Sequence, residues 1–215
     1  MLVGERMSHP VIHISPDTSI HDALQLMKRE GIRRTPVVKK GKLVGIVSEK
    51  DLLNATPSQA TTLSVWELNY LLSKITIEDI MTRDIITVTE DTPIEDAARI
   101  MADHKIGGLP VMRNDSMVGI ISETDLFRLL LELMGAREEG VRVTFMATDK
   151  PGELEKVTEA IARQGGNILA VGTFAGEDQA TREVALKVSG IEEKKLKSLI
   201  EPLVKSIKDI RTTKP

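Results

Sequence analysis

The sequence predicts an α+β (α/β-like) chain in which one unit occurs twice and a third unit of different order follows. Two observations carry this prediction. Residues 45–52 read GIVSEKDL and residues 119–126 read GIISETDL, an offset of 119 − 45 = 74 that holds without a gap over about 7–53 and 81–127. After Leu133 the repeat ends and a different succession of strand and helix patterns begins. Internal repeats of this kind mark copies of one structural unit.

In each copy, the pattern of apolar and turn residues predicts a strand, a helix, a hairpin-like pair of strands and a second helix. In the first copy we expect a short strand at Val11–Ile14, a helix capped by Asp17 or Thr18 and ended by Gly31, strands at Thr35–Val38 and Leu43–Val47, and a helix that begins after Ser48. The second copy repeats this order, with Asn114-Asp115-Ser116 as the turn of its strand pair.

The composition is that of an ordinary soluble globular protein. Of 215 residues, 41% are hydrophobic and 28% are charged, so the chain can bury a core. Only 2% are aromatic, so we expect an aliphatic core. The sequence has no Cys, which excludes disulfides and Cys nucleophiles and fits a reducing cytoplasm, where we expect the protein to act.

Charge and hydropathy argue against two classes of partner. The formal net charge is −3, from 29 Lys and Arg against 32 Asp and Glu, which is a poor match for nucleic acid. No apolar run approaches the roughly 18 residues that a membrane-spanning helix needs. Residues 1–6 also lack the apolar segment of a signal peptide. We therefore expect neither a nucleic-acid partner nor a membrane partner.

The tail of each copy has two interpretations. Ser48-x-x-Asp51 and Ser122-x-x-Asp125 each stand between an apolar strand and an apolar helix. One interpretation is a capping box that opens the helix. The other is a nucleotide site, because the first turn of a helix offers free N–H groups to a phosphate and an Asp there can accept hydrogen bonds from ribose hydroxyls.

The repeat resembles a tandem pair of cystathionine-β-synthase (CBS) domains. The residues that carry the resemblance recur in both copies: Met7-Ser8-His9-Pro10 and Met81-Thr82-Arg83-Asp84, Ile32-Arg33-Arg34-Thr35-Pro36-Val37 and Ile106-Gly107-Gly108-Leu109-Pro110-Val111, and the two Ser-x-x-Asp tails. The resemblance implies two βαββα-type repeats packed as a pseudo-two-fold pair, with clefts between them that bind an adenine nucleotide such as AMP or ATP. It implies ribose contacts for Asp51 and Asp125. The full set of implied site residues is Ile12, Arg33, Arg34, Thr35, Pro36, Ser48 and Asp51 in the first copy, and Ile86, Lys105, Gly107, Gly108, Leu109, Pro110, Ser122 and Asp125 in the second.

The two clefts are not expected to be equivalent. Where the first copy has Arg33-Arg34, the second has Gly107-Gly108, with Lys105 just before. Arg33 or Arg34 can pair with a phosphate, whereas two glycines let a ligand approach the backbone closely. The alternative is that these cations are solvated surface.

The segment between the copies predicts a loop followed by a helix. Residues 56–62 are polar and contain Pro57, and Leu63–Ile75 has helical apolar spacing. The only Trp and the only Tyr, Trp66 and Tyr70, lie there. A core or dimer-contact role for this helix is favoured over ligand stacking.

The third unit predicts the order βαββαβ, an α+β sandwich with its helices on one face of an antiparallel sheet. A polar, Gly-bounded joint at Met134–Gly140 precedes it. The expected elements are strands at Val141–Ala147, Ile168–Ala175, Arg182–Val188 and Ser206–Arg211, and helices at Glu153–Arg163 and Glu192–Leu199.

Residues 141–212 resemble the ACT domain. The resemblance rests on Asp149-Lys150-Pro151-Gly152-Glu153-Leu154 and on Gly166-Asn167-Ile168 after the first helix. It implies a ferredoxin-like fold and an amino-acid site formed by Asp149, Pro151, Gly152, Leu154, Asn167 and Ile168. Pro151 favours a helical first turn and Gly152 clears space, so the free N–H groups there can hold a carboxylate. The alternative is a tight strand-to-helix turn without a ligand.

No enzyme is predicted, because the sequence has no Gly-rich phosphate loop, nucleophile elbow or metal triad. His9 and His13 are four residues apart, but Pro10 makes this segment extended and no third ligand is near, so no metal site is expected.

We therefore predict a regulatory sensor whose effector is AMP, ATP or another adenosine ligand, with no catalytic cofactor. The order of its parts is similar to that of the acetoin-utilisation (AcuB-type) proteins. The expected domains are 1–76 for the first repeat plus connecting helix, 77–134 for the second repeat, 135–140 for a linker and 141–215 for the ACT domain. A homodimer and an unknown regulated protein are the expected partners. A structural adaptor without a small-molecule ligand is the alternative.

Overall fold

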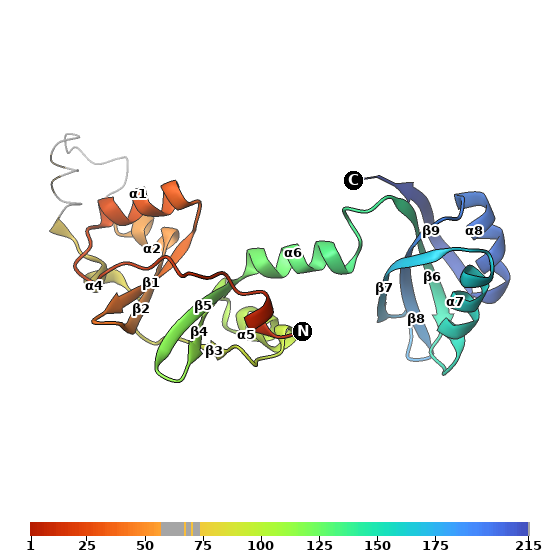
Figure 1. Cartoon of the computed structure of the whole chain (residues 1–215), viewed down its shortest axis with the longest axis horizontal. Coiled ribbons are helices and arrows are strands. Elements are labelled where there is room, and N and C mark those ends of the chain that lie inside the picture. Colours follow the sequence, from red (N-terminus) through yellow and green to blue (C-terminus); the bar gives the residue numbers. More distant parts are fainter. Residues whose placement is uncertain (57–66, 68–69, 71–73, 215) are drawn as a thin grey trace. The chain divides into compact units, whose positions relative to one another are not determined.

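The computed structural model describes residues 1–56, 67, 70 and 74–214 (Figure 1). The chain divides into two compact units, Met1–Leu126 and Phe127–Pro215. The expected helix at Leu63–Ile75, with Trp66, lies almost wholly outside the described residues. Tyr70 is described, and its ring is exposed with Lys74 Nζ 5.3 Å from the ring centroid.

The first unit contains the two repeats. The first repeat has helix α1 (Ile20–Glu30), strands β1 (Arg34–Lys39) and β2 (Lys42–Ser48) and helix α2 (Glu49–Asn54). The second has helix α4 (Ile77–Ile80), strand β3 (Val88–Thr89), helix α5 (Ile94–His104), strands β4 (Gly108–Arg113) and β5 (Ser116–Ser122), and helix α6 (Glu123–Leu133). A short 3-10 helix, η1 (Val3–Glu5), lies at the start of the chain, before both repeats. The two hairpins have identical registers at the offset of 74, which confirms the repeat.

The expected start of α1 was wrong by one or two residues. Ser19, rather than Asp17 or Thr18, is the N-cap, and its hydroxyl accepts the backbone N–H of Asp22 at 3.1 Å. Asp17 instead accepts the hydroxyl of Ser15. Gly31 ends the helix in the left-handed conformation (φ 64°), as expected, because glycine has no Cβ to oppose a positive φ.

The strand expected at Val11–Ile14 is reduced to one parallel bridge, between Ile14 and Val37. One reason is that the Ile12 carbonyl accepts the Thr35 hydroxyl at 2.8 Å instead of a strand N–H. The chain before this segment pairs with the other copy. Ser8 bridges antiparallel to Ile120 in the second repeat, and its repeat mate Thr82 bridges antiparallel to Ile46 in the first. The segment that opens each repeat therefore pairs with the second hairpin strand of the other copy.

The second unit has the predicted order βαββαβ. It consists of strand β6 (Gly140–Thr148), helix α7 (Glu153–Arg163), strands β7 (Asn167–Ala175) and β8 (Thr181–Ser189), helix α8 (Glu193–Ile200), the 3-10 helix η2 (Glu201–Leu203) and strand β9 (Ser206–Thr213). The strands form one antiparallel sheet in the order β7-β8-β6-β9.

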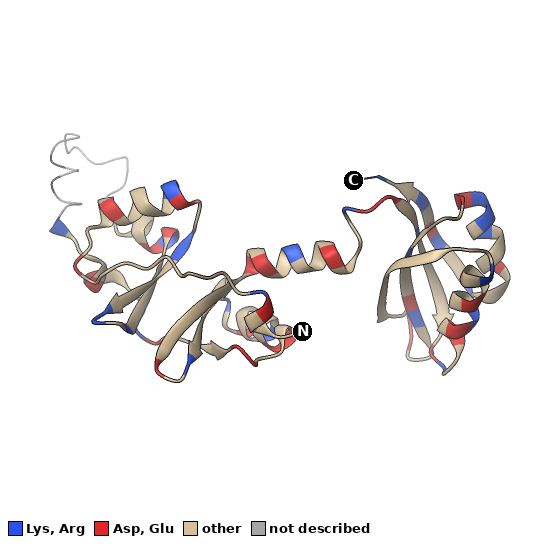
Figure 2. Cartoon of the chain, viewed as in Figure 1, with Lys and Arg blue, Asp and Glu red and all other residues tan. Residues whose placement is uncertain are grey.

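The core of the second unit lies between the sheet and its two helices, which cover the same face (Figure 1). Phe145, Leu186, Ile161 and Leu196 are fully buried there. The outer surfaces of α7 and α8 carry charges of both signs, interspersed along the helices (Figure 2). No helix in the described part of the chain is long and apolar enough to cross a membrane.

Candidate functional site

A cavity of about 540 Å³ lies between the two repeats. The first repeat contributes residues from the start of β1, the end of β2 and the first turn of α2. The second contributes the segment before β3, the end of α5 and the start of β4. The lining residues are Arg33, Arg34, Ile46, Ser48, Glu49, Lys50, Asp51, Thr82, Asp84, Ile85, Ile86, Lys105, Ile106, Gly107, Gly108, Pro110 and Glu123.

Ser48 and Asp51 are held rigidly in this cavity by a capping box. Asp51 Oδ2 accepts the backbone N–H of Ser48 at 2.8 Å and its hydroxyl at 2.7 Å, and Ser48 Oγ accepts the backbone N–H of Asp51 at 3.3 Å. The capping interpretation is therefore realised. It does not exclude the nucleotide interpretation, because a carboxylate has about four acceptor positions. Among the described residues these bonds engage Oδ2 alone, so Oδ1 remains an acceptor within the cavity.

The backbone of the second repeat forms the opposite wall. Lys105 ends α5 in the left-handed conformation (φ 54°), which turns the chain directly into Ile106 and Gly107. Ile86 and Ile106 are half-buried in this wall. The wall therefore offers aliphatic side chains opposite the Ser48–Asp51 pair.

Arg34 crosses from the first repeat to the second. Its guanidinium donates to the carbonyl oxygen of Gly107, and Nη2 lies 3.9 Å from Glu123 Oε2. A Cβ added at Gly107 would lie 2.6 Å from Arg34 Cζ, and one at Gly108 would lie 2.9 Å from Arg34 Cδ. The two glycines thus make room for Arg34, a role that the sequence did not reveal. Burial lowers the pKa of the Arg34 guanidinium, and Glu123 opposes this shift.

The charges of the cavity balance. Four cationic and four anionic side chains line it: Arg33, Arg34, Lys50 and Lys105, against Glu49, Asp51, Asp84 and Glu123. The cavity is therefore not a simple anion site.

Nine of the fifteen predicted nucleotide-site residues line this cavity: Ile86, Arg33, Arg34, Ser48, Asp51, Lys105, Gly107, Gly108 and Pro110. Thr35 and Leu109 are fully buried, and Thr35 Oγ1 donates to the carbonyl of Ile12 at 2.8 Å. Pro36 is also buried, and Ile12 is exposed outside the cavity.

Ser122 and Asp125 form the corresponding tail of the second repeat and do not line this cavity. Asp125 Oδ2 accepts the backbone N–H of Ser122 at 2.9 Å and its hydroxyl at 2.6 Å, as Asp51 Oδ2 does with Ser48 in the first tail. Arg33 Nη2 donates to Thr124 Oγ1 at 3.3 Å, so cations of the first repeat reach this tail too.

Sequence reasoning missed several lining residues. Asp84 belongs to the Met81-Thr82-Arg83-Asp84 motif, and Glu123 follows Ser122 directly, so both had a signal in the repeat pattern. Lys50 lies inside the Ser48-x-x-Asp51 tail and adds a cation that neighbours the cavity's carboxylates.

A second cavity, of about 430 Å³, lies in the second unit at the entrance to α7. The predicted residues Asp149, Pro151, Gly152 and Leu154 line it, together with Ala147, Thr148, Lys150, Glu153, Glu155, Thr173, Arg182 and Val184. Arg182 Nε donates to Asp149 Oδ2 at 3.2 Å, and Gly152 has φ 86°, a conformation that favours glycine.

Asn167 and Ile168 do not join this second cavity. Asn167 pairs with Ser189 at one end of the β7–β8 ladder, whereas Ala175 pairs with Arg182 at the other. Because the strands are antiparallel, the residues that enter α7 and those that enter β7 lie at opposite ends of the sheet.

Family comparison identifies both parts of the chain. The CBS domain model matches residues 3–58 and 77–132, which together are more than half of the chain. This chain belongs to the CBS-domain family. Its C-terminal part, residues 139–211, matches the TTHA0829-like ACT domain, so the predicted order of a CBS pair and an ACT domain is confirmed.

Solved structures of CBS pairs are similar to the first unit. The CBS domain pair of protein MJ0100, in complex with 5′-methylthioadenosine and S-adenosyl-L-methionine, is 33% identical (TM-score 0.51) and covers 60% of this chain and 95% of its own. The acetoin utilization protein AcuB from Vibrio cholerae is 32% identical (TM-score 0.52; 64% and 98% covered). CBSX2 in complex with AMP is 29% identical (TM-score 0.51; 60% and 96% covered).

This chain matches less than half of the length of three curated relatives. The matched regions cover 46%, 28% and 44% of those proteins, at 32–33% identity. CBS pairs and ACT domains are regulatory modules, and some relatives, such as inosine-5′-monophosphate dehydrogenases, are enzymes that contain a CBS part. Across the described ranges, no group of three or more His, Asp or Glu side chains is placed to hold a metal ion.

Proposed function

We propose that this CBS–ACT protein is a regulatory sensor without catalytic activity, and that an adenosine ligand binds in the cavity between its repeats. One observation carries the proposal: residues of both repeats line a single cavity of about 540 Å³. Ser48 and Asp51 come from the first copy, and Ile86, Gly107 and Gly108 come from the second. This volume lies within the range of small-molecule sites. The complexes of MJ0100 and CBSX2 with adenosine compounds support the ligand class.

The cavity offers a contact for each part of such a ligand. Asp51 Oδ1 accepts from the ribose hydroxyls, and Ser48 fixes the carboxylate in place through two bonds to Oδ2. Ile86 and Ile106 provide an aliphatic surface for the base. Arg34, already turned into the cavity, is the cation for an anionic group of the ligand.

The balanced charge narrows the choice among adenosine compounds. Four cations stand against four carboxylates in the lining. A triphosphate would bring several negative charges beside Glu49, Asp84 and Glu123, and like charges repel at this distance. We therefore favour AMP or another small adenosine compound of low net charge over ATP.

The test is a thermal-shift and calorimetric titration of the full chain with AMP, 5′-methylthioadenosine, S-adenosylmethionine and ATP. Binding at a hundred times the dissociation constant stabilises the native state by about 2.7 kcal/mol. Asp51→Ala is the diagnostic variant. Asp79→Ala is its matched control, because Asp79 makes the same two bonds to Thr76 (2.9 and 2.8 Å) but lies outside the cavity.

We expect saturable binding that Asp51→Ala abolishes and Asp79→Ala retains. Equal loss in both variants would show that the Asp acts only as a helix cap, and the absence of binding by all four compounds would overturn the proposal.

We further propose an amino-acid effector at the entrance to α7, where Asp149, Pro151 and Gly152 line the second cavity. Lys150 and Arg182 are its cations for a carboxylate. Titration with the twenty amino acids tests this, with Arg182→Gln expected to weaken the response. Asn167 is not part of this proposed site.

A structural adaptor is the second candidate, and one observation favours it. In both Ser-x-x-Asp tails the Asp carboxylate accepts the Ser hydroxyl without any ligand, so each tail has a structural role of its own. In either case we propose a cytoplasmic homodimer that acts on a separate regulated protein.

A further inference from the structure

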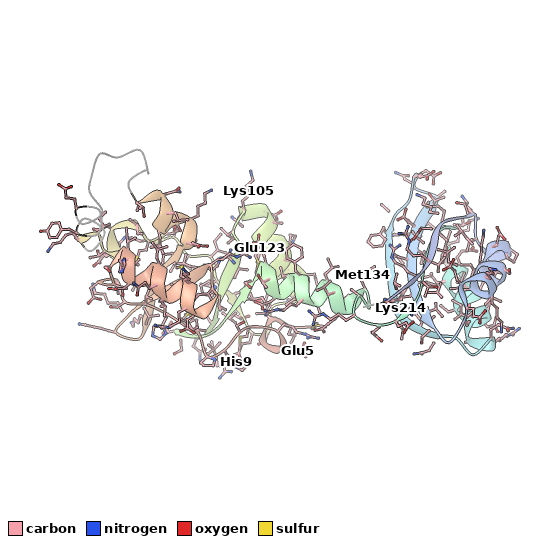
Figure 3. All side chains as sticks on the ribbon, turned by 90° about the horizontal axis from the view of Figure 1, so that it is seen from above. Glu5, His9, Lys105, Glu123, Met134 and Lys214 are labelled. Atoms are coloured by element: carbon pink, nitrogen blue, oxygen red, sulfur yellow. The ribbon has the colours of Figure 1, made fainter. Side chains whose placement is uncertain are left out.

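Helix α6 links the adenosine cavity to the ACT domain in a single element. Its first residue, Glu123, lines the cavity, and Met134 follows its last turn (Figure 3). The helix begins in the first compact unit and ends in the second. Its eleven residues form one continuous hydrogen-bonded backbone across the boundary of the two units.

The start of α6 is hydrogen-bonded to the same backbone oxygen as Arg34, one of the residues that line the cavity. The backbone N–H of Glu123 donates to the carbonyl oxygen of Gly107 at 3.1 Å, and the same oxygen accepts from Arg34. Arg34 also lies 3.9 Å from the Glu123 carboxylate. A ligand that pairs with Arg34 competes with this oxygen and with the Glu123 carboxylate for the N–H groups of Arg34, which links ligand binding to the contacts of the first turn of α6.

The end of α6 is a Schellman motif. Gly135 has φ 56°, its N–H donates to Glu132 O at 2.9 Å, and the N–H of Ala136 donates to Leu131 O at 2.8 Å. The carbonyl oxygen of Gly135 then accepts Lys187 Nζ at 2.7 Å, from strand β8. A cation at this position also complements the negative end of the helix dipole.

Lys187 belongs to the sheet face opposite α7 and α8. Its neighbours Leu186 and Val188 are buried in the helix-side core, and side chains alternate along a strand. Only 5% of Lys187 is exposed. A Cβ at Gly135 would lie 3.4 Å from Lys187 Cδ and 3.5 Å from Ala170 Cβ, so the turn after α6 rests directly on this face.

A lysine is a costly choice for this position. A buried ammonium loses its hydration, and an apolar side chain of similar length would fill the same space without that loss. What the ammonium adds is a directional bond to one carbonyl oxygen, which fixes the end of α6 in one position on the sheet.

We propose that α6 carries the state of the adenosine cavity to the ACT sheet, and that Lys187 is the positioning residue that couples the helix to that sheet. This inference rests on the proposed function, because it gives the route by which the same cavity acts.

The test does not require the ligand to be known. Amide hydrogen exchange is measured on the full chain for the wild type, Arg34→Ala, Lys187→Met and the double variant. Arg34→Ala removes the cavity-side contact, so exchange should change at residues 134–138 and in β8. Lys187→Met should accelerate exchange at residues 134–138 on the order of tenfold, as expected for the loss of a charged hydrogen bond. In the Lys187→Met background, Arg34→Ala should no longer change exchange in β8.

The controls separate coupling from loss of stability. Lys208→Met is matched to Lys187→Met, because Lys208 lies in the same sheet and forms ion pairs with Glu183 of β8 at 2.9 Å and with Glu177 at 3.2 Å. It should leave the response to Arg34→Ala intact. Lys187→Gln and Glu123→Gln repeat the cycle with smaller changes if a first variant unfolds.

An unchanged β8 in Arg34→Ala, or a response of the same size with and without Lys187, would overturn the inference. Adding saturating AMP gives the second arm. Binding of AMP without any change in β8 exchange would overturn the coupling while leaving the proposed sensor intact, whereas failure of AMP to bind bears on the sensor alone.

Discussion

Met81 of the second repeat packs on Gly45 of the first so closely that a Cβ at Gly45 would lie 2.9 Å from Met81 Cγ. The reciprocal contact is also present: Met7 of the first repeat packs on Gly119 of the second, where an added Cβ would lie 2.8 Å from Met7 Cγ. The two Gly-Met pairs match at the offset of 74, as do the bridges Ser8–Ile120 and Thr82–Ile46. The cavity between the repeats is thus flanked by segments that each repeat packs against the other.

Gly45→Ala is therefore expected to destabilise the CBS pair by about 1–3 kcal/mol, the usual cost of overpacking. Gly119→Ala should behave alike. The measurement is urea unfolding, with Lys42→Ala on the same strand as the control, because Lys42 is exposed. Met81→Ala in the Gly45→Ala background should recover part of the loss. Equal stability of Gly45→Ala and Lys42→Ala would contradict this packing.

Thr35→Val is expected to cost stability without affecting ligand binding. Thr35 is fully buried and its hydroxyl donates to Ile12 O at 2.8 Å, so valine leaves that carbonyl without its donor, at about 1–3 kcal/mol. Chemical unfolding measures the loss, and AMP titration should give the wild-type affinity. Thr89→Val, at an exposed position, is the control. If Thr35→Val instead lost most of its affinity for AMP at an unchanged free energy of unfolding, Thr35 would contact the ligand after all.

Acid is expected to weaken the second repeat through Glu90. Arg113 donates to both carboxylate oxygens of Glu90, at 2.6 and 2.7 Å, and these bonds lower its pKa. The folded state therefore binds this proton less readily than the unfolded chain, whose Glu has a pKa of about 4.3. The contribution is present above that value and is lost as the pH falls through the lower folded pKa.

The measurement for Glu90 compares urea midpoints from pH 7 to pH 3 in the wild type and Arg113→Met. The gap between them should be widest near neutral pH and should narrow in acid. Arg99→Met, which removes an exposed helical pair with Asp96, should follow the wild type. A gap that is constant with pH would refute the assignment.

The fold was predictable wherever the signal was local or repeated. Helix α7 has the predicted bounds, Glu153–Arg163, because Gly152 and the Gly165-Gly166 pair enclose a strong helical pattern. The hairpins were predictable because Lys40-Gly41 and Asn114-Asp115 are turn sequences, and Lys40 and Asn114 do adopt positive φ.

The parts that could not be predicted depend on contacts distant in sequence. At Val11–Ile14 the Ile12 carbonyl accepts a side-chain hydroxyl from Thr35, 23 residues away, and nearby Ser8 pairs 112 residues away (120 − 8) with Ile120. The space above Gly107 looked open to a ligand, whereas Arg34 occupies it. Asn167 was grouped with Asp149 by motif, although the register of β7 and β8 separates their ends of the sheet.

Amide NMR of the full chain during titration with AMP tests the central claim most directly, because it locates the ligand. We predict saturable shifts at Asp51, Gly107 and Gly108, residues of two different repeats that line one cavity. Asp79, which makes the same capping box elsewhere, should not shift. Shifts confined to residues outside the cavity, or none at saturating AMP, would contradict an adenosine site between the repeats.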